Sequence, residues 1–481
     1  MNTKMVRYIL CRMLGVESCL LLFPALVALI YQEKCGALFL IPAGILFLLF
    51  IFAGMKKPEN SHIYGKEGMV IVALAWILWS LFGAMPFTLS GYVPNYVDAF
   101  FETVSGFTTT GSSIIQDVEA LPHCLLFWRS FTHWIGGMGV LVFVLVVTSL
   151  DKKNSMYLMR AEVPGPEKDK LVPKAMSTAR ILYGMYLILT VVEIIFLMIG
   201  GMNLFDSMIF SFGSAGTGGF SNYADSVAHF HSAYIDGVIT VFCALFGVNF
   251  ALFYFMLLGD FKSILKNEEL RTYILLIAGA TALITANIHS LYPTIGKAFR
   301  YAIFQVVTII TTTGYSTADF AKWPMFSRAI IMMLTVVGAC ASSTGGGIKV
   351  SRLLVGMKCV KREIVQMVHP KSVGIIRIGG KKVSSDVLRT IYIYFIAYVG
   401  ILIGSVILIS LDNFDFETTF SAVLTTLGNV GPGMAKVGPM GNFAAFSPFS
   451  KLVLCFDMLA GRLEIFPFLM LFTAPAWRRK F

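Results

Sequence analysis

The sequence predicts an all-α polytopic membrane protein built largely from four similar repeats, and three observations support this. Of its 481 residues, 57% are hydrophobic and 14% charged, with a mean hydropathy of +0.76; soluble proteins average about 25% charged. Several apolar stretches have the length of about 20 residues that a helix needs to cross a bilayer. One arrangement of helices and glycine-rich segments recurs four times. Together these observations exclude a soluble globule, a collagen and a disulfide scaffold.

Two hydrophobic segments come first, at about 8–31 and 36–54, joined by a polar turn at Gln32–Lys34. We interpret the first segment as a retained helix. Its apolar run is too long for a signal peptide, and no small-residue cleavage site follows it.

A pattern of long helix, short apolar run, Gly/Thr-rich segment and long helix then repeats four times. The expected pairs of long helices are 68–91 with 123–150, 178–201 with 232–258, 272–292 with 326–364, and 387–411 with 448–475. The short runs between them are 98–108, 205–214, 298–309 and 416–426. Such runs are too short to span and suit re-entrant helices. Because internal repeats fix architecture, we expect ten spanning helices and four half-helices around one ion pore.

These boundaries divide the chain into five parts, two N-terminal transmembrane helices and four pore repeats. The N-terminal pair occupies 1–66, and the repeats occupy 67–151, 152–262, 263–370 and 371–481.

The charges predict the orientation of the chain in the membrane. Most Lys and Arg lie at the two ends or in alternate loops such as 151–180 and 349–389, so the positive-inside rule puts both termini in the cytosol. The net charge of +11 therefore reflects topology, and no nucleic-acid partner is expected. The opposite loops carry acidic residues: Asp98, Asp117, Glu119, Asp225, Asp319, Asp412, Asp415 and Glu417. We expect the half-helices to enter from outside, below an acidic vestibule that concentrates cations.

The four Gly/Thr-rich segments, at 108–112, 216–221, 311–316 and 428–433, are the strongest functional signal. Their composition favours extended or left-handed backbone, which is tolerated at membrane depth where it lines a cavity. Four such segments can form a ring of carbonyl oxygens that replaces the hydration shell of a monovalent cation. The C-terminal dipoles of the half-helices favour cations at the same place. Small-residue helix packing would explain one such segment but not four at matched positions.

This plan resembles the Trk/Ktr/HKT superfamily of potassium-uptake proteins. Two further stretches, 338–349 (GACASSTGGGIK) and 461–467 (GRLEIFP), are most similar to the bacterial TrkH/TrkG membrane subunit. The resemblance implies a K⁺ selectivity filter made of Thr109, Thr110, Gly111, Thr217, Gly218, Gly219, Thr312, Thr313, Gly314, Asn429, Val430 and Gly431. It implies K⁺ contacts at Thr110, Gly111, Gly219, Thr313, Gly314, Val430 and Gly431.

Particular filter positions refine this expectation. Glycine at 111, where serine accompanies sodium preference in the plant branch, implies potassium. The choice of Gly219 over Gly218 rests on matching the Thr-x-Gly-aromatic-Ser pattern of the third segment. Where the first and third segments carry two threonines before the glycine, the fourth carries Asn429 and Val430. This difference makes the expected ring asymmetric.

The stretch 338–349 interrupts its helix, because the three glycines Gly345, Gly346 and Gly347 cannot hold a stable helix. A hinge suits this break, and a packing kink is the alternative. By resemblance the stretch is a gate beneath the filter, joined there by Arg462. A structural pair of Arg462 with Glu464, Asp457 or a loop carbonyl is the other reading.

Three more polar residues lie within apolar stretches. Glu193 is expected to have a structural partner and receives no role, and Arg129 and His133 are also interpreted as structural.

Phosphate-loop, paired-carboxylate and nucleophile motifs are absent from the sequence, so we do not expect an enzyme. The resemblance implies K⁺ as substrate, a homodimer in the bacterial inner membrane, and a cytosolic TrkA-type partner through which NAD or ATP acts. An H⁺- or Na⁺-coupled K⁺ symporter is the alternative function. Coupling to H⁺ or Na⁺ is not required for uptake, since a membrane potential of about 150 mV contributes roughly 3.5 kcal/mol per charge to the inward movement of K⁺.

Overall fold

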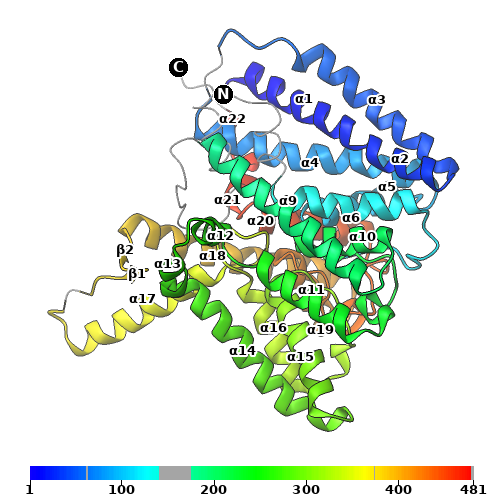
Figure 1. The fold of residues 1–481 in the computed structure, drawn as a ribbon. Helices are drawn as coiled ribbons and strands as arrows, with labels where there is room; N and C mark the ends of the chain where they lie inside the picture. The colour runs from blue at the N-terminus through cyan, green and yellow to red at the C-terminus, as the bar shows by residue number, and fades with distance from the viewer. Residues whose placement is uncertain (61–62, 140–174, 373, 478–481) are drawn as a thin grey trace.

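The computed structural model describes residues 1–60, 63–139, 175–372 and 374–477 (Figure 1). Regular structure in these ranges is helical except for one short hairpin. Its strands β1 (Arg377–Ile378) and β2 (Lys381–Lys382) pair antiparallel. The second part of the helix expected at 123–150, most of the basic loop 151–180, and Arg478, Arg479 and Lys480 lie outside the described residues.

The N-terminal pair covers the first repeat. Helices α1 (Thr3–Leu20) and α2 (Leu22–Ile30) form one span. The second span runs through η1 (Lys34–Phe39), α3 (Leu40–Leu49) and η2 (Phe50–Gly54). Helix α1 packs on α4 and α2 packs on α6, so the pair lies against the outside of the repeats.

The first helix of each repeat is long and continuous. These helices are α4 (Gly65–Leu89), α9 (Ala175–Ile199), α14 (Glu268–Ile288) and α18 (Ser385–Ile409). With the two N-terminal spans they give six helices, among the described residues, that are long and apolar enough to cross a membrane. Six of the ten expected spans therefore lie where the hydrophobic pattern put them.

A short helix of 12 to 16 residues follows each long one. These half-helices are α5 (Tyr96–Phe107), α10 (Leu204–Gly216), α15 (Ile295–Ile310) and α19 (Phe416–Leu427). Each begins at a side chain that accepts a hydrogen bond from the first turn: Asn95, Asn203, Thr294 and Asp415. Such N-caps satisfy otherwise unpaired backbone donors and fix where each half-helix starts.

The second helices are shorter than expected. They are α6 (His123–Gly137), α11 (Ala233–Phe246), α16 (Met325–Val337) and α20 (Pro448–Arg462). The continuous helix expected at 232–258 is instead bent by 93° between α11 and α12 (Phe250–Leu257), and Asn249 caps the new start.

The helix expected at 448–475 also ends early. Glu464 and Ile465 have positive φ values of 54° and 67°, a region that excludes helix continuation. After them, the described residues as far as Trp477 form the short helices α21 (Phe466–Leu469), η8 (Met470–Phe472) and α22 (Ala474–Trp477). At the break between α11 and α12, the carbonyl of Gly247 accepts a hydrogen bond from the Cys340 N–H of the stretch 338–349.

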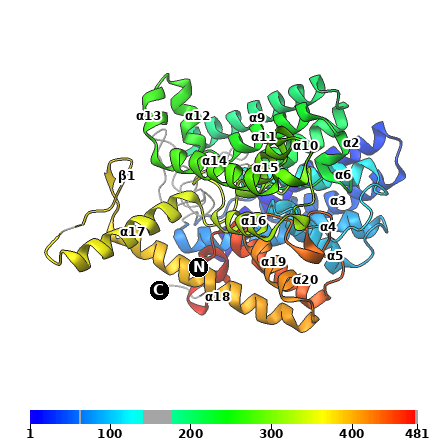
Figure 2. The same ribbon diagram turned by 90° about the horizontal axis from the view of Figure 1, so that it is seen from below.

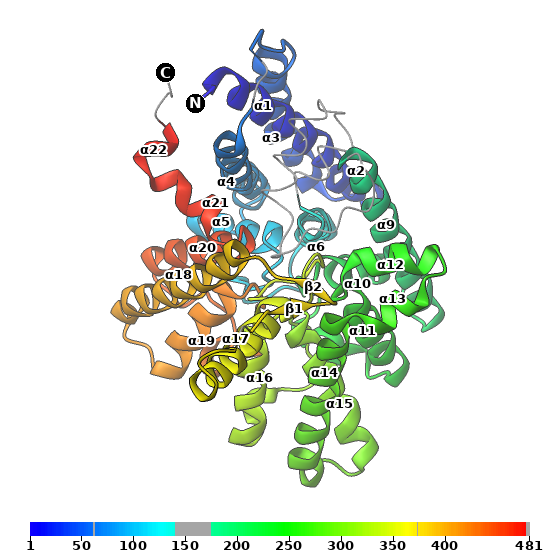
Figure 3. The ribbon, with the colours of Figure 1, turned by 90° about the vertical axis from the view of Figure 1, so that its left-hand side faces the viewer.

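The four repeats close into a ring. Helix α6 packs on α10, α11 on α15, α16 on α19, and α20 on α5. The second helix of each repeat thus contacts the half-helix of the next, and the fourth repeat contacts the first. Figure 3 shows the repeats in chain order around a common centre.

Helix α17 (Val350–Val368) and the β hairpin project from this ring, toward the left in Figures 1 and 2. The N-terminus and α22, the last helix described, lie toward that side in Figure 1, and the turn after α2 lies at the opposite end. The remaining short helices are η3 (Ser226–Phe230), α13 (Phe261–Lys266), η4 (His289–Leu291), η5 (Phe320–Lys322), η6 (Ser410–Asp412) and η7 (Ala435–Val437).

Candidate functional site

The four glycine-rich segments share one backbone conformation. In each, the glycine has a positive φ, and so does the residue two positions before it. The non-glycine members are Thr109, Thr217, Thr312 and Asn429, with φ of 53° to 61°. Left-handed backbone at such residues carries strain of about 1–3 kcal/mol, and it persists where surrounding structure enforces it. The recurrence at four matched positions makes it a property of the repeat.

One hydrogen bond recurs with this conformation. The N–H of the residue before each glycine donates to a carbonyl five residues back in the half-helix. The four donor–acceptor pairs, 2.8 to 2.9 Å apart, are Thr110–Ser105, Gly218–Gly213, Thr313–Thr308 and Val430–Thr425. Each segment is therefore tied to the end of its own half-helix, whose last carbonyls carry the negative end of the helix dipole.

Each of the four glycines lies against a backbone carbonyl of another repeat, and these four contacts form a closed cycle. A Cβ added to Gly111 would lie 1.9 Å from the carbonyl oxygen of Gly218, and one on Gly219 would lie 2.0 Å from that of Thr313. The cycle continues from Gly314 to Val430 at 2.2 Å and from Gly431 to Thr110 at 2.7 Å. Each glycine thus abuts the carbonyl that precedes the glycine of the next repeat, and only a residue without a side chain fits there.

A cavity of about 160 Å³ lies directly over this ring and is lined by all four glycines. Among the described residues that line it, Arg129 is the one charged residue. The acidic vestibule expected from the sequence is therefore wrong for the space next to the ring.

The acidic residues of this side are occupied elsewhere. Asp98 accepts a 2.6 Å bond from Lys451, Glu119 accepts from the Ala224 N–H, and Asp415 caps α19. Hydrogen bonds from the Thr418 hydroxyl and N–H lower the pKa of Asp415, so it stays ionised. These charges contribute a field at longer range and do not line the cavity over the ring.

A polar residue on three of the half-helices holds the chain that follows the glycine. Glu102 accepts from the Ser113 hydroxyl at 3.0 Å and from the Ile114 N–H at 3.0 Å. Gln305 donates to the Ala318 carbonyl at 3.2 Å. Ser421 accepts from the Met434 N–H at 2.9 Å. Each of the three follows directly after the phenylalanine of its short helix. The sequence therefore marks their positions, but only the structure shows their contacts.

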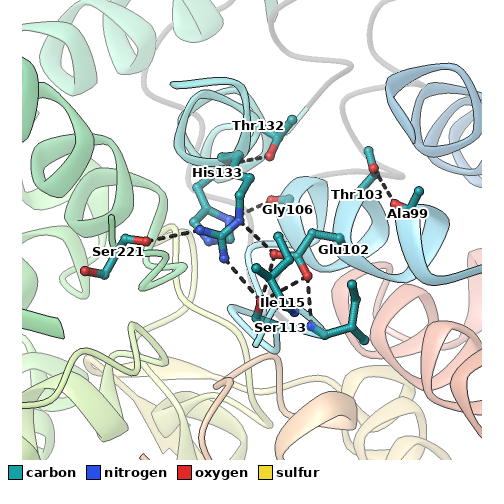
Figure 4. Close-up of polar contacts among 11 residues, drawn as sticks. Ala99, Glu102, Thr103, Gly106, Ser113, Ile115, Thr132, His133 and Ser221 are labelled. Atoms are coloured by element: carbon teal, nitrogen blue, oxygen red, sulfur yellow. Dashed lines mark hydrogen bonds and ion pairs between the residues drawn. The ribbon is translucent and has the colours of Figure 1, made fainter. Parts of the chain in front are cut away.

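Glu102 also forms a buried ion pair with Arg129 of α6 (Figure 4). Arg129 donates through Nε to Glu102 at 2.8 Å and through a terminal nitrogen to the Ser221 carbonyl at 3.1 Å. Its guanidinium lies over the Phe220 ring, 4.1 Å from the centroid. Arg129 and Glu102 are 3% and 1% exposed. The pair joins the ends of the first and second segments, which agrees with the structural role expected for Arg129.

His133 supports the same two segments from behind. Its Nδ1 is 2.7 Å from the Gly106 carbonyl oxygen, and its ring stacks on Phe220 with centroids 4.1 Å apart. A Cβ on Gly218 would lie 2.4 Å from this ring. The structural role expected for His133 is therefore consistent with its position.

The fourth segment differs from the others in its side chains. The hydroxyls of Thr108 and Thr110 are 2.8 Å apart, and those of Thr311 and Thr313 are 2.9 Å apart. In the fourth segment, Asn429 donates through its amide to the Thr110 hydroxyl at 3.0 Å and to the Met458 carbonyl at 2.9 Å. The ring is therefore asymmetric in its side chains although its backbone repeats.

The stretch 338–349 lies between α16 and α17 as a buried irregular loop and contacts the segments directly. The Gly346 N–H donates to the Thr312 hydroxyl at 2.6 Å. A Cβ on Gly345 would lie 2.8 Å from the Thr311 carbonyl oxygen, and one on Gly346 would lie 2.6 Å from that of Gly428. The loop is thus packed against the third and fourth segments.

Other contacts fix this loop from the side. The Cys340 N–H donates to the carbonyl of Gly247, at the break between α11 and α12, at 3.0 Å. Glu269 accepts from the N–H groups of Ala341 and Ser351, at 2.7 and 3.1 Å. Lys349 is buried, and its ammonium donates to the Gly345 carbonyl. Lys349 ends the stretch 338–349 quoted from the sequence but received no role there, and Glu269 was not singled out, because a charged residue near a basic loop gives no signal of such contacts.

Arg462 joins this loop to the first repeat. One terminal nitrogen donates to the Thr344 carbonyl at 2.8 Å, and the other donates to the carbonyls of Gly136 and Gly137 at 2.6 and 3.0 Å. These contacts agree with the loop-carbonyl interpretation of Arg462. Asp457 instead accepts from Ser405, and Glu464 pairs with Arg352.

The described residues do not show the expected partner of Glu193 at hydrogen-bonding geometry. It is fully buried in α9, and its two oxygens have no hydrogen-bond partner among the described residues. Its position near Ser214 of α10 puts it behind the second segment, away from the ring itself.

Fold and site together define a helical membrane protein whose four repeats surround a ring of backbone carbonyls. A family model described as TrkH, cation transport protein, matches residues 43–478. The chain belongs to this TrkH family of cation transport proteins.

Individual relatives extend over nearly the whole chain. The Trk system potassium uptake protein TrkH of Escherichia coli K12 is 35% identical over 468 residues, which are 95% of this chain and 96% of that protein. TrkG of the same strain is 32% identical, covering 99% and 100%. The crystal structure of the potassium transporter TrkH from Vibrio parahaemolyticus matches with a TM-score of 0.89 at 32% identity, covering 99% and 100%. The expected all-α membrane fold and the family resemblance are confirmed.

Proposed function

We propose that this chain is a potassium-uptake transporter of the bacterial inner membrane, in which K⁺ permeates through the ring of four segments. The observation that carries the proposal is the closed cycle in which each glycine abuts the carbonyl of the next repeat. Backbone carbonyls held in this way substitute for the water around a K⁺ ion. The names of relatives that share 35% of the sequence supply the identity of the ion.

The proposed filter consists of the residues inferred from the sequence. Thr110, Gly218, Thr313 and Val430 contribute the carbonyls that lie against the neighbouring glycines. The remaining members, Thr109, Gly111, Thr217, Gly219, Thr312, Gly314, Asn429 and Gly431, set the backbone conformation. The cavity over the ring is the proposed outer entrance.

The proposed gate is the loop at Gly345, Gly346 and Gly347 together with Arg462. The packing of the loop against the third and fourth segments supports this role, because ions leaving the ring on that side meet the loop. The Arg462 guanidinium adds positive charge beneath the ring, which opposes the passage of a cation.

The proposed orientation puts the cavity outside and both termini in the cytosol. It follows from the positive charge of the N-terminus and of the projecting α17 and hairpin. We extend the proposal to a homodimer and to a cytosolic TrkA-type partner through which NAD or ATP acts, on the basis of family resemblance.

A flux experiment with the purified chain in liposomes tests the function. We expect passive flux that favours K⁺ and Rb⁺ over Na⁺ and Li⁺ and follows the applied potential. Flux that starts only when a proton or sodium gradient is imposed would replace this proposal with the symporter.

A matched pair of variants tests the ring. Gly314→Ala adds a methyl group facing the Val430 carbonyl, whereas Gly91→Ala adds one in open space, and both glycines have a φ of +77°. We expect K⁺ flux to fall at least tenfold in the first variant only. Equal flux in both variants would contradict the assignment of the ring.

A further inference from the structure

A second site lies away from the ring, where the turn after α2 meets the first turn of α6. The sulfur atoms of Cys35 in η1 and Cys124 in α6 are 3.0 Å apart. Cys124 is fully buried and Cys35 is half-buried. Cys35 belongs to the N-terminal pair of helices and Cys124 to the first repeat, so the contact joins two parts of the fold.

Neighbouring groups hold the two backbones together independently of the sulfur atoms. Glu33 accepts a 2.6 Å bond from the His123 N–H and a 3.0 Å bond from the Cys124 N–H. The rings of Tyr31 and His123 stack with centroids 3.9 Å apart. The turn is thereby anchored on the start of α6, and the approach of the two thiols is a consequence of that anchoring.

Two kinds of chemistry fit such a cluster, a metal ion or a disulfide. Glu33, Cys35 and Cys124 offer three ligand atoms within 4.8 Å of one another. Two thiolates bound to one tetrahedral zinc ion at about 2.3 Å would be about 3.8 Å apart, wider than the 3.0 Å observed. Glu33 already accepts two backbone hydrogen bonds at the start of α6. The observed separation is about 0.8 Å below the value for a shared zinc ion and about 1 Å above the 2.05 Å of a disulfide, so the choice between them rests on where this end of the molecule lies.

We propose that Cys35 and Cys124 form a disulfide bond that fastens the N-terminal helices to the first pore repeat. The inference rests on the proposed orientation, which places this end of the molecule outside the cytosol, where disulfides form and persist. The bond would hold α2 and η1 against α6, the helix that carries Arg129 and His133.

The oxidation needs an external disulfide, supplied by an extracytoplasmic protein or a small-molecule disulfide. Cys35 is the more exposed thiol, so its thiolate attacks that disulfide and releases one thiol of the oxidant. The Cys124 sulfur then attacks Cys35 Sγ and expels the second sulfur of the oxidant, which takes up the Cys124 proton and leaves as a thiol. Two S–H bonds are lost and one S–S bond forms here, while the oxidant is reduced from a disulfide to two thiols.

Counting thiols in the intact protein tests the proposal. The full-length chain is purified from membranes without reductant, denatured, and labelled with maleimide-polyethylene glycol before and after reduction. Of its eight cysteines, we expect two fewer to be labelled before reduction, and we expect mass spectrometry to find the Cys35–Cys124 peptide pair. Cys35→Ser and Cys124→Ser should each abolish the difference, whereas Cys11→Ser, a matched change at another buried cysteine, should keep it.

Three results would overturn the disulfide. They are eight labels without reduction, a cross-link that involves a different cysteine, and one equivalent of zinc that is lost in Cys35→Ser. Ion flux is not the readout, so failure of this inference is distinguishable from failure of the proposed function.

Discussion

The N–H of Gly346 donates a 2.6 Å hydrogen bond to the hydroxyl of Thr312. Thr312 has a left-handed backbone, with φ of 61°, two residues before the glycine of the third segment. The loop after α16 and the ring of segments are therefore in direct contact, and any movement of the loop away from the ring must break this bond.

Removing the acceptor of this bond should loosen the loop. We expect Thr312→Val to raise K⁺ flux several-fold, because the Gly346 N–H loses its partner and the closed position is destabilised. Thr308→Val is the matched control, since the Thr308 hydroxyl donates within its own half-helix to the Phe304 carbonyl at 3.0 Å. Liposome flux at a fixed potential measures both variants, and unchanged flux in Thr312→Val would argue against a gating role for this contact.

We expect Arg462 to oppose the passage of cations as well as to hold the loop against the first repeat. We expect Arg462→Ala to increase flux at least threefold, because it removes a positive charge and frees the carbonyls of Thr344, Gly136 and Gly137. Deletion of Gly345–Gly347 should act in the same direction. A fall in flux, with a monodisperse protein of normal thermal stability, would favour a purely structural role for Arg462.

Serine at the first ring position should weaken discrimination against sodium. The Gly111→Ser side chain would begin 1.9 Å from the Gly218 carbonyl oxygen, so that carbonyl must move and its distance to the ion changes. We expect the K⁺/Na⁺ permeability ratio to fall at least tenfold in reversal-potential measurements. Gly91→Ser, where the added atoms meet open space, should leave the ratio unchanged. Equal ratios in the two variants would remove Gly111 from the filter.

The buried pair Glu102–Arg129 should be important for stability. Leaving one charge of such a pair without its partner costs about 3–5 kcal/mol, so Glu102→Gln and Arg129→Gln should each lower the thermal unfolding temperature by several degrees. The double variant should cost less than the sum, because the second change removes the unpaired charge. Additive losses in unfolding experiments would mean that the two side chains do not interact.

The sequence was most informative where a single physical requirement determines composition. Long apolar runs must cover the thickness of a bilayer, and six of the expected spans lie where these runs are. The glycines at 111, 219, 314 and 431 were identifiable because a close approach and a positive φ both exclude other residues. The division of the chain at 66, 151, 262 and 370 stays a prediction.

Features that depend on distant partners were not predicted. The helix expected at 232–258 breaks at Gly247, whose carbonyl binds the Cys340 N–H from another repeat. Glu102 and Arg129 lie on different helices, and the sequence does not show that folding brings these two side chains together. The acidic vestibule was wrong for the space next to the ring, because the positions of acidic residues in the sequence do not reveal that Asp98 is paired with Lys451 or that Asp415 caps a helix.

The closed cycle of glycines has a genetic consequence, because one chain supplies all four quarters of the ring. In a pore made of four identical subunits, a single codon change alters every quarter at once. Here a change at Gly431 leaves Gly111, Gly219 and Gly314 as they were. Each quarter can therefore diverge alone, as the fourth has done with Asn429 and Val430, and the pore can be altered one side at a time.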